Sequence, residues 1–262
     1  MLSRDKACLV REEDIGSRIS IKSRKSRKSR ESRKKETKLN DSERHINRAM
    51  LPEPTLRRLP WYLAYLKMLD LKHQEHVSST QIAKSLNVDA SQIAKDLSFL
   101  NIKGKTRIGY EVHPLTRALT EFLGFKHRHN AFLIGAGSLG SALMRDLGLM
   151  QFGLNIVAAF DIDPHIIGSA VGDIPIYDLA QLAQQQHSSG VSIAIVAVPP
   201  ESAQDVANTL VASNIKAIWN FTPFRIKVPR HVVVQNTSIY SDLALMYNNM
   251  EVNVNNKNNI AK

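Results

Sequence analysis

The hydrophobic positions of the chain change their spacing about half-way along. Between residues 54 and 100, leucine and isoleucine recur at steps of three and four, the period of amphipathic helices that share a core. From residue 131 onward, short continuous apolar runs alternate with amphipathic stretches, as in buried parallel strands joined by helices. The pattern predicts an α/β protein with a helical front part and a Rossmann-type, doubly wound parallel sheet behind it.

Three helices are predicted in the front part, and the last two have the spacing of a helix-turn-helix. The apolar stripe of the first helix consists of Leu56, Leu59, Leu63, Leu66 and Leu69. Ser79 is the expected N-cap of the second helix. Ala83 is small where two helices cross, Asn87 can adopt the turn conformation, and Ile93 returns an apolar side chain to the pair. An ordinary helical hairpin is the alternative interpretation.

A basic segment after these helices favours DNA binding. Residues 101–112 predict two short strands around Gly104, the wing of a winged helix. The second helix of a helix-turn-helix enters the major groove, so the polar face of the third predicted helix becomes a candidate reading surface. The candidate DNA contacts, from the first helix, the third helix and the wing, are Arg57, Arg58, Ser91, Lys95, Ser98, Lys103, Lys105 and Arg107. A linking helix over 114–125 is expected to follow.

A glycine-rich loop lies between a predicted strand at 131–134 and a predicted helix at 141–147. It reads Gly135-Ala136-Gly137-Ser138-Leu139-Gly140. Gly135 allows a tight turn, Gly137 lets a pyrophosphate approach the backbone, and Gly140 allows close packing of helix on strand. The free N–H groups of the helix N-terminus favour phosphate. The loop predicts a dinucleotide site.

The acid at the end of the next strand selects the dinucleotide. Asp161 follows the strand 155–160 and lies 21 residues after Gly140, where a carboxylate accepts both ribose hydroxyls and repels a 2′-phosphate. This favours NAD(H) over NADP(H). Later predicted strands end near the expected nicotinamide position, although ordinary turn chemistry is the alternative there. These ends add the candidate cofactor contacts Val198, Pro199, Asn220, Thr222 and Pro223.

The charge is distributed very unevenly. Residues 1–50 have a net charge of +8, residues 51–128 of +5, and residues 129–262 of −2. A Ser-Arg-Lys repeat from Ser23 to Lys34 buries no apolar surface, so residues 1–50 are predicted to be a disordered basic tail. The tail is either a phosphate-binding arm or the product of a start codon assigned upstream of Met50. The basic front predicts a polyanionic partner.

Other features restrict the function class. The chain has one cysteine, so an intramolecular disulfide framework is excluded. No apolar run is long enough to cross a membrane, and a cytoplasmic protein is expected. None of the nine histidines stands beside an acid at the end of a predicted central strand. We therefore expect neither a catalytic set nor a metal site, and an NAD-dependent oxidoreductase is a minor alternative.

The order of these motifs resembles the Rex family of redox-sensing transcriptional repressors, over about residues 52–250. The matching residues are Arg58-Leu59-Pro60, Ser78-Ser79, Lys95-Asp96-Leu97, Gly104-Lys105, Gly109-Tyr110, the glycine loop 135–140, Phe160-Asp161-Ile162-Asp163-Pro164 and Asn220-Phe221-Thr222-Pro223. The resemblance implies a homodimer that binds double-stranded operator DNA when NADH is scarce and releases it when NADH binds.

The resemblance also implies a domain plan. A winged-helix domain is expected at 51–128 and the NAD(H)-binding Rossmann domain at 129–235. A C-terminal dimerisation helix at 236–250 is expected to pack on the partner subunit, and a disordered tail at 251–262 to follow it.

Four positions depart from the family pattern. Ala94 replaces an arginine that usually precedes the Lys-Asp pair of the recognition helix. Ala64, Asp146 and Ser238 replace residues of an interdomain network tied to the redox switch. These changes leave a second hypothesis open, namely a DNA-binding protein that holds NAD(H) without a working switch. They also predict an altered preference for the operator sequence.

Overall fold

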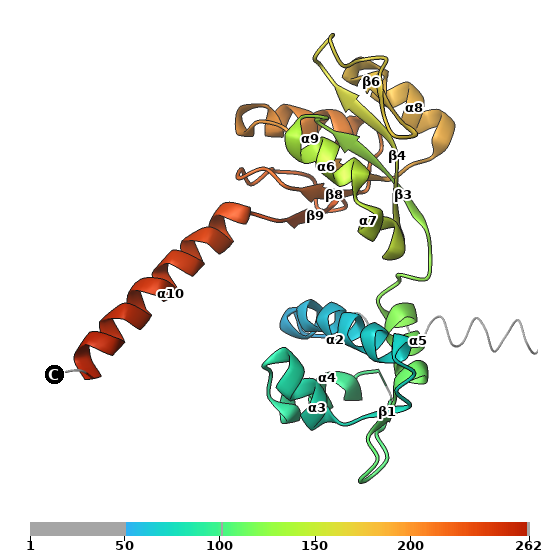
Figure 1. The fold of residues 1–262 in the computed structure, drawn as a ribbon. Helices are drawn as coiled ribbons and strands as arrows, with labels where there is room; N and C mark the ends of the chain where they lie inside the picture. The colour runs from blue at the N-terminus through green and yellow to red at the C-terminus, as the bar shows by residue number, and fades with distance from the viewer. Residues whose placement is uncertain (1–50, 101, 261–262) are drawn as a thin grey trace, which may run out of the picture. The chain divides into compact units, whose positions relative to one another are not determined.

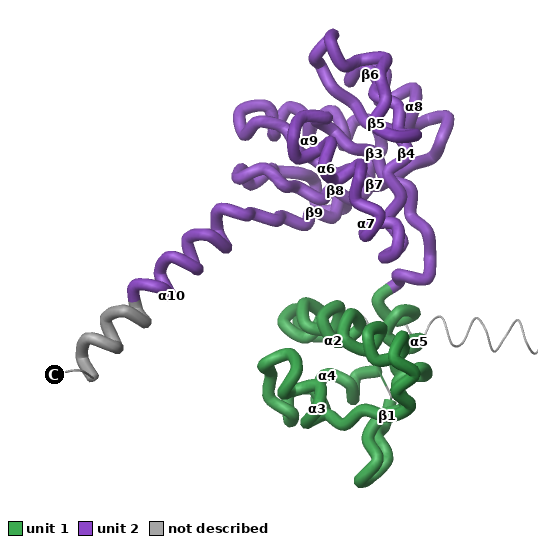
Figure 2. Tube along the Cα trace, in the orientation of Figure 1, with its two compact units in different colours: residues 1–123 green, residues 124–262 purple. Residues whose placement is uncertain are grey.

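The structure is a computed structural model that describes residues 51–100 and 102–260. It divides into two compact units, residues 1–123 and residues 124–262 (Figure 2). The predicted boundary at 128 thus lies five residues beyond the one observed. The expected disordered tail at 1–50 and the last two residues lie outside the described residues.

In its described part, residues 51–100 and 102–123, the first unit has four helices and a two-stranded sheet (Figure 1). In chain order its elements are α2 (Glu53–Leu71), β1 (His76–Val77), α3 (Ser79–Leu86), α4 (Ala90–Ser98), β2 (Tyr110–Glu111) and α5 (Val112–Phe122). Its fully buried apolar side chains come from all four helices and include Leu59, Leu63, Leu66, Ile82, Ile93, Leu97, Leu115 and Leu119. The stripe of α2 includes Tyr62 in place of the predicted Leu56, which is 37% exposed.

The turn between α3 and α4 has the geometry of a helix-turn-helix. Asn87 ends α3 in the left-handed conformation at φ 53°, as predicted. The N-cap of α3 is Ser78, whose hydroxyl accepts a hydrogen bond from the N–H of Gln81 at 3.0 Å. The prediction of Ser79 as the cap was wrong by one residue, because both serines precede the apolar stripe and the sequence does not say which one has extended φ and ψ.

The wing is built differently from the predicted hairpin around Gly104. β2 pairs antiparallel with β1, which precedes the helix-turn-helix, and a single bridge joins Lys105 to Gly109. The wing therefore turns at residues 106–108, where Arg107 has a φ of 67°. Gly109, at φ 94°, lies against the backbone of Val77, where a side chain would not fit. The linking helix α5 begins at Val112, two residues earlier than predicted.

The second unit contains a seven-stranded sheet in the order β5-β6-β4-β3-β7-β8-β9. The strands are β3 (His129–Ile134), β4 (Leu154–Asp161), β5 (Ala170–Val171), β6 (Ile174–Asp178), β7 (Ile193–Val196), β8 (Ala217–Asn220) and β9 (Val233–Asn236). Six strands are parallel, and β5 adds an antiparallel edge that was not predicted. The chain reverses its winding direction at β3, which lies between β4 and β7.

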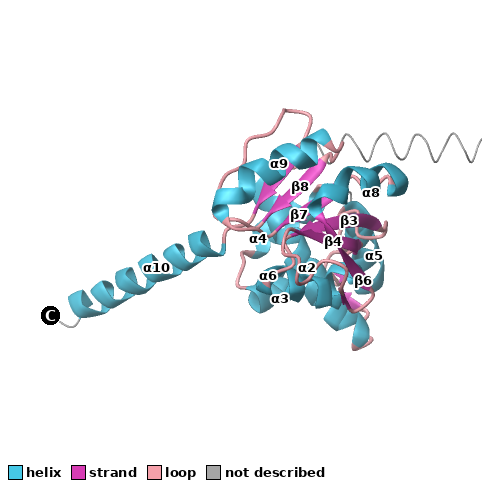
Figure 3. Ribbon diagram, turned by 90° about the horizontal axis from the view of Figure 1, so that it is seen from above, coloured by secondary structure: helices cyan, strands magenta, loops and turns pink. Residues whose placement is uncertain are grey.

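Helices cover both faces of this sheet (Figure 3). α8 (Leu182–Ser189) and α9 (Ala203–Ala212) contribute Leu182, Val206 and Leu210 to a core with Phe132 and Phe160. On the opposite face, α6 (Ser138–Arg145) and α7 (Leu147–Gln151) pack on Leu133, Ala159 and Ile195. The doubly wound sheet predicted from alternating apolar runs is thus confirmed.

The last helix, α10, runs from Ile239 to Ile260. The predicted helix ended at 250, and the expectation of a tail without structure is wrong for residues 251–260. No glycine or proline follows Pro229 to stop the helix, and extending a helix costs less than starting one. Every side chain from Ile239 to Glu251 is exposed, including seven large hydrophobic ones.

Candidate cofactor pocket and nucleic-acid interface

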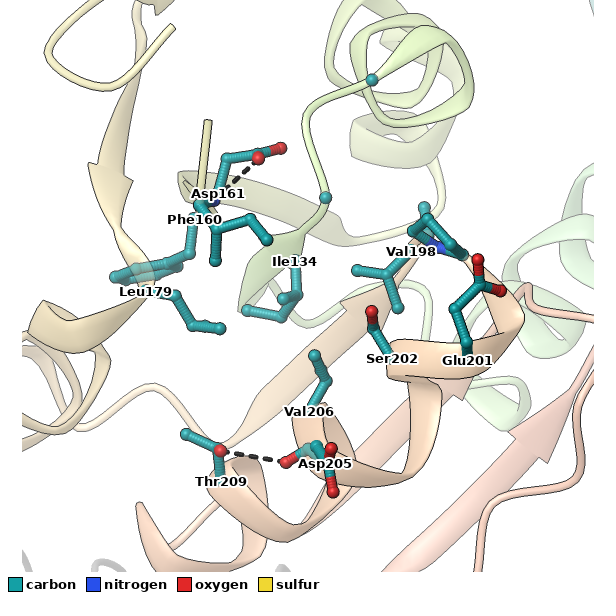
Figure 4. A pocket seen from close by; sticks show the side chains of 15 residues that line it. Ile134, Phe160, Asp161, Leu179, Val198, Glu201, Ser202, Asp205, Val206 and Thr209 are labelled. Atoms are coloured by element: carbon teal, nitrogen blue, oxygen red, sulfur yellow. Dashed lines mark hydrogen bonds between the residues drawn. The ribbon is translucent and has the colours of Figure 1, made fainter. Parts of the chain in front are cut away.

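A cavity of about 400 Å³ opens at the carboxyl ends of the central strands of the second unit. It lies where the winding of the sheet reverses, which is where open α/β sheets bind their ligands. Figure 4 shows Ile134, Val198 and Val206 around one space, with Asp161 at its edge. The full lining is Ile134, Gly135, Gly137, Phe160, Asp161, Ile162, Leu179, Ala197, Val198, Pro199, Glu201, Ser202, Asp205, Val206 and Thr209.

The glycine loop has the close backbone contacts that its sequence predicts. Gly135 has a φ of 93°, and a Cβ there would meet the carbonyl oxygen of Ala197. A Cβ on Gly140 would collide with the carbonyl oxygen of Gly135. Gly137 has open space instead, with no heavy atom within 4 Å of an added Cβ. A ligand can therefore approach the backbone at Gly137, while the other two glycines are required for packing.

Asp161 ends β4 and fixes the glycine loop. Its Oδ2 accepts a hydrogen bond from the N–H of Ala136 at 2.7 Å. Its Oδ1 accepts from the N–H groups of Ile162 at 2.7 Å and Asp163 at 3.0 Å. The carboxylate is thus held at the mouth of the cavity by three backbone donors, and the lone pair that remains on Oδ2 can accept a ribose hydroxyl group.

The structure brings together only part of the predicted cofactor set. Gly135, Gly137, Asp161, Val198 and Pro199 line the cavity. The other loop residues lie beside it, where Ala136 and Gly140 are buried and Ser138 and Leu139 are exposed.

The predicted residues after β8 hold their own turn. Oδ1 of Asn220 accepts the hydroxyl of Thr222 at 2.8 Å, and Nδ2 of Asn220 donates to the carbonyl of Phe224 at 2.7 Å. Asn220 and Thr222 are buried, Pro223 is exposed, and none of the three lines the cavity described above. In this structure these residues serve the turn, the alternative that the sequence left open.

Several lining residues were not predicted. Glu201, Asp205 and Thr209 project from the segment that follows β7, and the apolar walls come from strand ends and Leu179. The walls could have been inferred, because the last residue of each central parallel strand meets the same edge. The polar residues from α9 carry no motif, so only the helix orientation identifies them.

The side chains on the candidate DNA face of α4 are exposed, but one of them already makes a hydrogen bond within the helix. Ser91, Ala94, Lys95 and Ser98 are all exposed. The hydroxyl of Ser98, however, donates to the carbonyl of Lys95 at 2.7 Å. Lys103 and Arg107 extend the exposed cationic surface into the wing.

Two other predicted DNA contacts, Arg57 and Lys105, already have acidic partners at the surface. Arg57 donates to Glu53 at 2.7 Å and Lys105 pairs with Glu111, all with exposed side chains. The ammonium of Lys105 lowers the pKa of Glu111. Surface pairs of this kind are worth little and can exchange for phosphate.

Arg58, the remaining predicted DNA contact of α2, is paired with a buried acid instead of an exposed one. Its Nε donates to Oδ2 of Asp96 at 2.7 Å and a second guanidinium nitrogen donates to Oδ1 at 2.9 Å. Only 22% of its side chain is exposed, and Asp96 is fully buried. The hydrogen bond to Asp96 raises the pKa of Arg58 further above its ordinary value. In this structure Arg58 serves the interior of the unit, because its charge is neutralised by a buried carboxylate.

Comparison with known proteins identifies both units. Residues 50–98 match the family described as "Putative DNA-binding protein N-terminus", and residues 126–224 match the "CoA binding domain" family. The redox-sensing transcriptional repressor Rex of Bacteroides fragilis is 54% identical over 82% of this chain and 98% of that protein. Rex of Bacteroides thetaiotaomicron is 52% identical over 82% of this chain and 97% of its own length. The chain belongs to the Rex family.

Solved structures of a Rex-family repressor agree with this assignment. RSP in complex with β-NAD+ and operator DNA has a TM-score of 0.73 at 33% identity, covering 79% of this chain and 96% of that one. RSP in complex with β-NADH has a TM-score of 0.71, and the match covers 79% of this chain and 98% of the RSP chain. Since the Rex relatives are transcriptional repressors, the chain is a regulator and not an enzyme, as predicted.

Three residues of this chain differ from the interdomain network expected for the Rex family, namely Ala64, Asp146 and Ser238. Ala64 is exposed on α2. Asp146 accepts the N–H of Gly148 at 2.8 Å as the N-cap of α7. Ser238 accepts the N–H of Ser241 at 3.2 Å. Asp146 and Ser238 therefore have local capping roles.

Among residues 51–100 and 102–260, no helix is long and apolar enough to cross a bilayer.

Proposed function

We propose that this Rex-family protein binds double-stranded operator DNA through α4 and the wing, and that NADH bound in the cavity of the second unit releases it. The observation that carries the proposal is the match to RSP, whose solved complexes contain NAD+ with operator DNA in one case and NADH in the other. The cavity beside Asp161 and the glycine loop fits a dinucleotide, since open backbone at Gly137 suits a pyrophosphate.

The residues suit NAD(H) better than NADP(H). The carboxylate of Asp161 is fixed by three backbone donors and would face the ribose, where a 2′-phosphate would be repelled. When bound, the cofactor would supply a nicotinamide ring that is charged in NAD+ and neutral in NADH. Asp161 would orient the ribose, and Val198 and Pro199 would line the wall beside the strand ends.

The functional form would be a homodimer formed through α10. Ile239, Leu243, Met246 and Met250 recur at steps of four, three and four along this exposed helix, so they share one face. A second copy of the chain offers the same face, and two winged helices related by a two-fold axis would read a palindrome. The protein would act in the cytoplasm, where bacteria keep their chromosome.

A DNA-binding protein without a redox switch is the second candidate. It is favoured by Ala64, which has no polar side chain, and by the capping roles of Asp146 and Ser238. One titration separates the two candidates: binding to a palindromic operator at fixed salt, with NADH added against an NAD+ background. Release by NADH supports the redox repressor, whereas tight binding that ignores NADH supports the second candidate.

A further inference from the structure

The interior of the first unit contains a carboxylate that neither the cofactor pocket nor the proposed DNA contacts use. Asp96 lies on α4 and is 0% exposed. It accepts hydrogen bonds from Thr55 at 2.9 Å and from Tyr62 at 2.8 Å, in addition to the two from Arg58. Gln92, one turn earlier on α4, donates to it at 2.8 Å. Burial opposes ionisation, but these hydrogen bonds outweigh it and lower the pKa of Asp96.

Three of the four donor residues come from α2, and we call them the socket. Thr55, Arg58 and Tyr62 are spaced three and four residues apart, so they project from one face of that helix. All three aim at a single side chain of α4. The apolar contacts of Ile93 and Leu97 beside it are not directional and would tolerate a small rotation of α4. A rotation that withdrew Asp96 from the socket would leave a buried charge without its donors, which is costly.

This socket controls which residues α4 presents outward. Lys95 directly precedes Asp96, and successive helical residues are about 100° apart around the axis. With Asp96 held inward, Ser91 and Lys95 are held in exposed positions. Gln92 is tied to Asp96 and so is not free to read a base.

We propose that the Arg58–Asp96 ion pair is a positioning device that fixes the rotation of α4, and thereby the register of Ser91 and Lys95 on operator DNA. The inference rests on the proposed function, since it concerns the same DNA contact. Arg58 and Asp96 act through the helix, and neither touches DNA. Buried ionic groups are best attested in roles of this kind, setting register where apolar contacts do not.

The test measures discrimination in the full chain. The probe is a duplex selected by the wild-type protein from a random-sequence library, compared at fixed salt with the same duplex after scrambling both half-sites. Asp96→Asn should lower the ratio of the two affinities by about tenfold, the size of one lost base contact. Asp89→Asn is the matched control, because it removes an equal charge from the N-cap of α4, where the side chain makes no capping hydrogen bond. Its ratio should equal that of the wild type.

A double variant separates positioning from stability. Arg58→Met with Asp96→Leu replaces the ion pair by apolar side chains, which commonly restores stability. We expect its melting temperature to exceed that of Asp96→Asn, while its discrimination stays about tenfold below wild type. Recovery of both properties would overturn the proposal, since the pair would then be merely structural.

A milder variant covers the case in which these proteins do not fold. Tyr62→Phe removes one hydrogen bond from the socket and should lower the ratio about threefold, within the range for one hydrogen bond. An unchanged ratio in Tyr62→Phe or Asp96→Asn overturns the inference while leaving the proposed function intact. If the wild-type protein itself does not discriminate between the duplexes, the proposed function fails and takes the inference with it.

Discussion

The carboxylate of Asp161 holds the backbone N–H of Ala136 at 2.7 Å, so the end of β4 and the glycine loop of β3 are joined at the mouth of the cavity. One side chain thus has two tasks, shaping the loop and facing the cofactor. The two tasks can be separated by substitution.

We expect Asp161→Asn to weaken NADH binding by roughly ten- to a hundredfold, because hydrogen bonds to a charged acceptor are stronger than those to an amide. The preference for NADH over NADPH should narrow as well, since the charge that repels a 2′-phosphate is gone. Fluorescence titration with both cofactors measures this. Asp163→Asn is the control, because Asp163 lies further from the strand end and does not line the cavity. Equal loss in both variants would contradict a specific role for Asp161.

Gly140→Ala should abolish cofactor binding through the backbone alone. The added methyl group would collide with the carbonyl oxygen of Gly135, and relieving this overlap costs about 1–3 kcal/mol or moves the loop. Thermal melting and NADH titration measure the two effects. Gly168→Ala is a useful comparison, since its Cβ meets open space although φ is 82°. It should lose some stability but retain NADH binding, and NADH affinity unchanged in Gly140→Ala would refute the steric argument.

The alkaline stability of the first unit should depend on Tyr62. Burial and the hydrogen bond to Asp96 raise the pKa of Tyr62 from 10.0 to about 12. Between these values the unfolded chain has lost the phenol proton and the folded chain keeps it, so stability falls as the pH rises from about 10 to 12. Tyr62→Phe should be less stable at neutral pH yet show a shallower alkaline decline in denaturant titrations. Tyr65→Phe, on the same helix, should decline as the wild type does.

Ala94→Arg should tighten binding to an operator of the usual family type by roughly five- to a hundredfold, because arginine reads guanine with two hydrogen bonds and alanine cannot. Ala94 is exposed on α4 next to Lys95, so an arginine fits there without disturbing the core. Anisotropy measurements on matched and scrambled duplexes distinguish a base contact from added charge. An equal gain on both duplexes would show only non-specific attraction.

Dimerisation should depend on one face of α10. Leu243→Asp introduces a charge at the centre of the apolar stripe and should weaken self-association by at least about tenfold. Leu245→Asp makes the same change on the same helix, but two residues along and therefore on another face. It should remain dimeric in sedimentation experiments. Loss of the dimer in both variants would assign the effect to helix stability instead.

Periodicity and spacing predicted the elements of both units, but not the side-chain orientations inside them. Asn87 and the glycine loop were predictable, because few residues adopt those backbone conformations. The pairing of Arg58 with Asp96 could not be predicted, because a surface arginine and one paired with a buried carboxylate have the same sequence signal. The hydrogen bonds of Asn220 and Thr222 within their own turn were not predictable either, since a strand end places residues near the ligand edge without saying which way they point. The polar wall from α9 was missed because it follows from tertiary packing alone.

At the tip of the wing, the residue that would be best for stability differs from the residue that would be best for DNA binding. Arg107 occupies the left-handed backbone region at φ 67°, which costs a residue with a Cβ roughly 1–2 kcal/mol. Glycine would fit that turn without strain, yet the chain keeps a cation at the outermost point of the hairpin. Selection for a higher melting temperature alone would therefore favour glycine at this position. Selection for tight binding to the operator would retain arginine. A variant of this protein that gains stability by replacing Arg107 with glycine should therefore bind its operator less tightly.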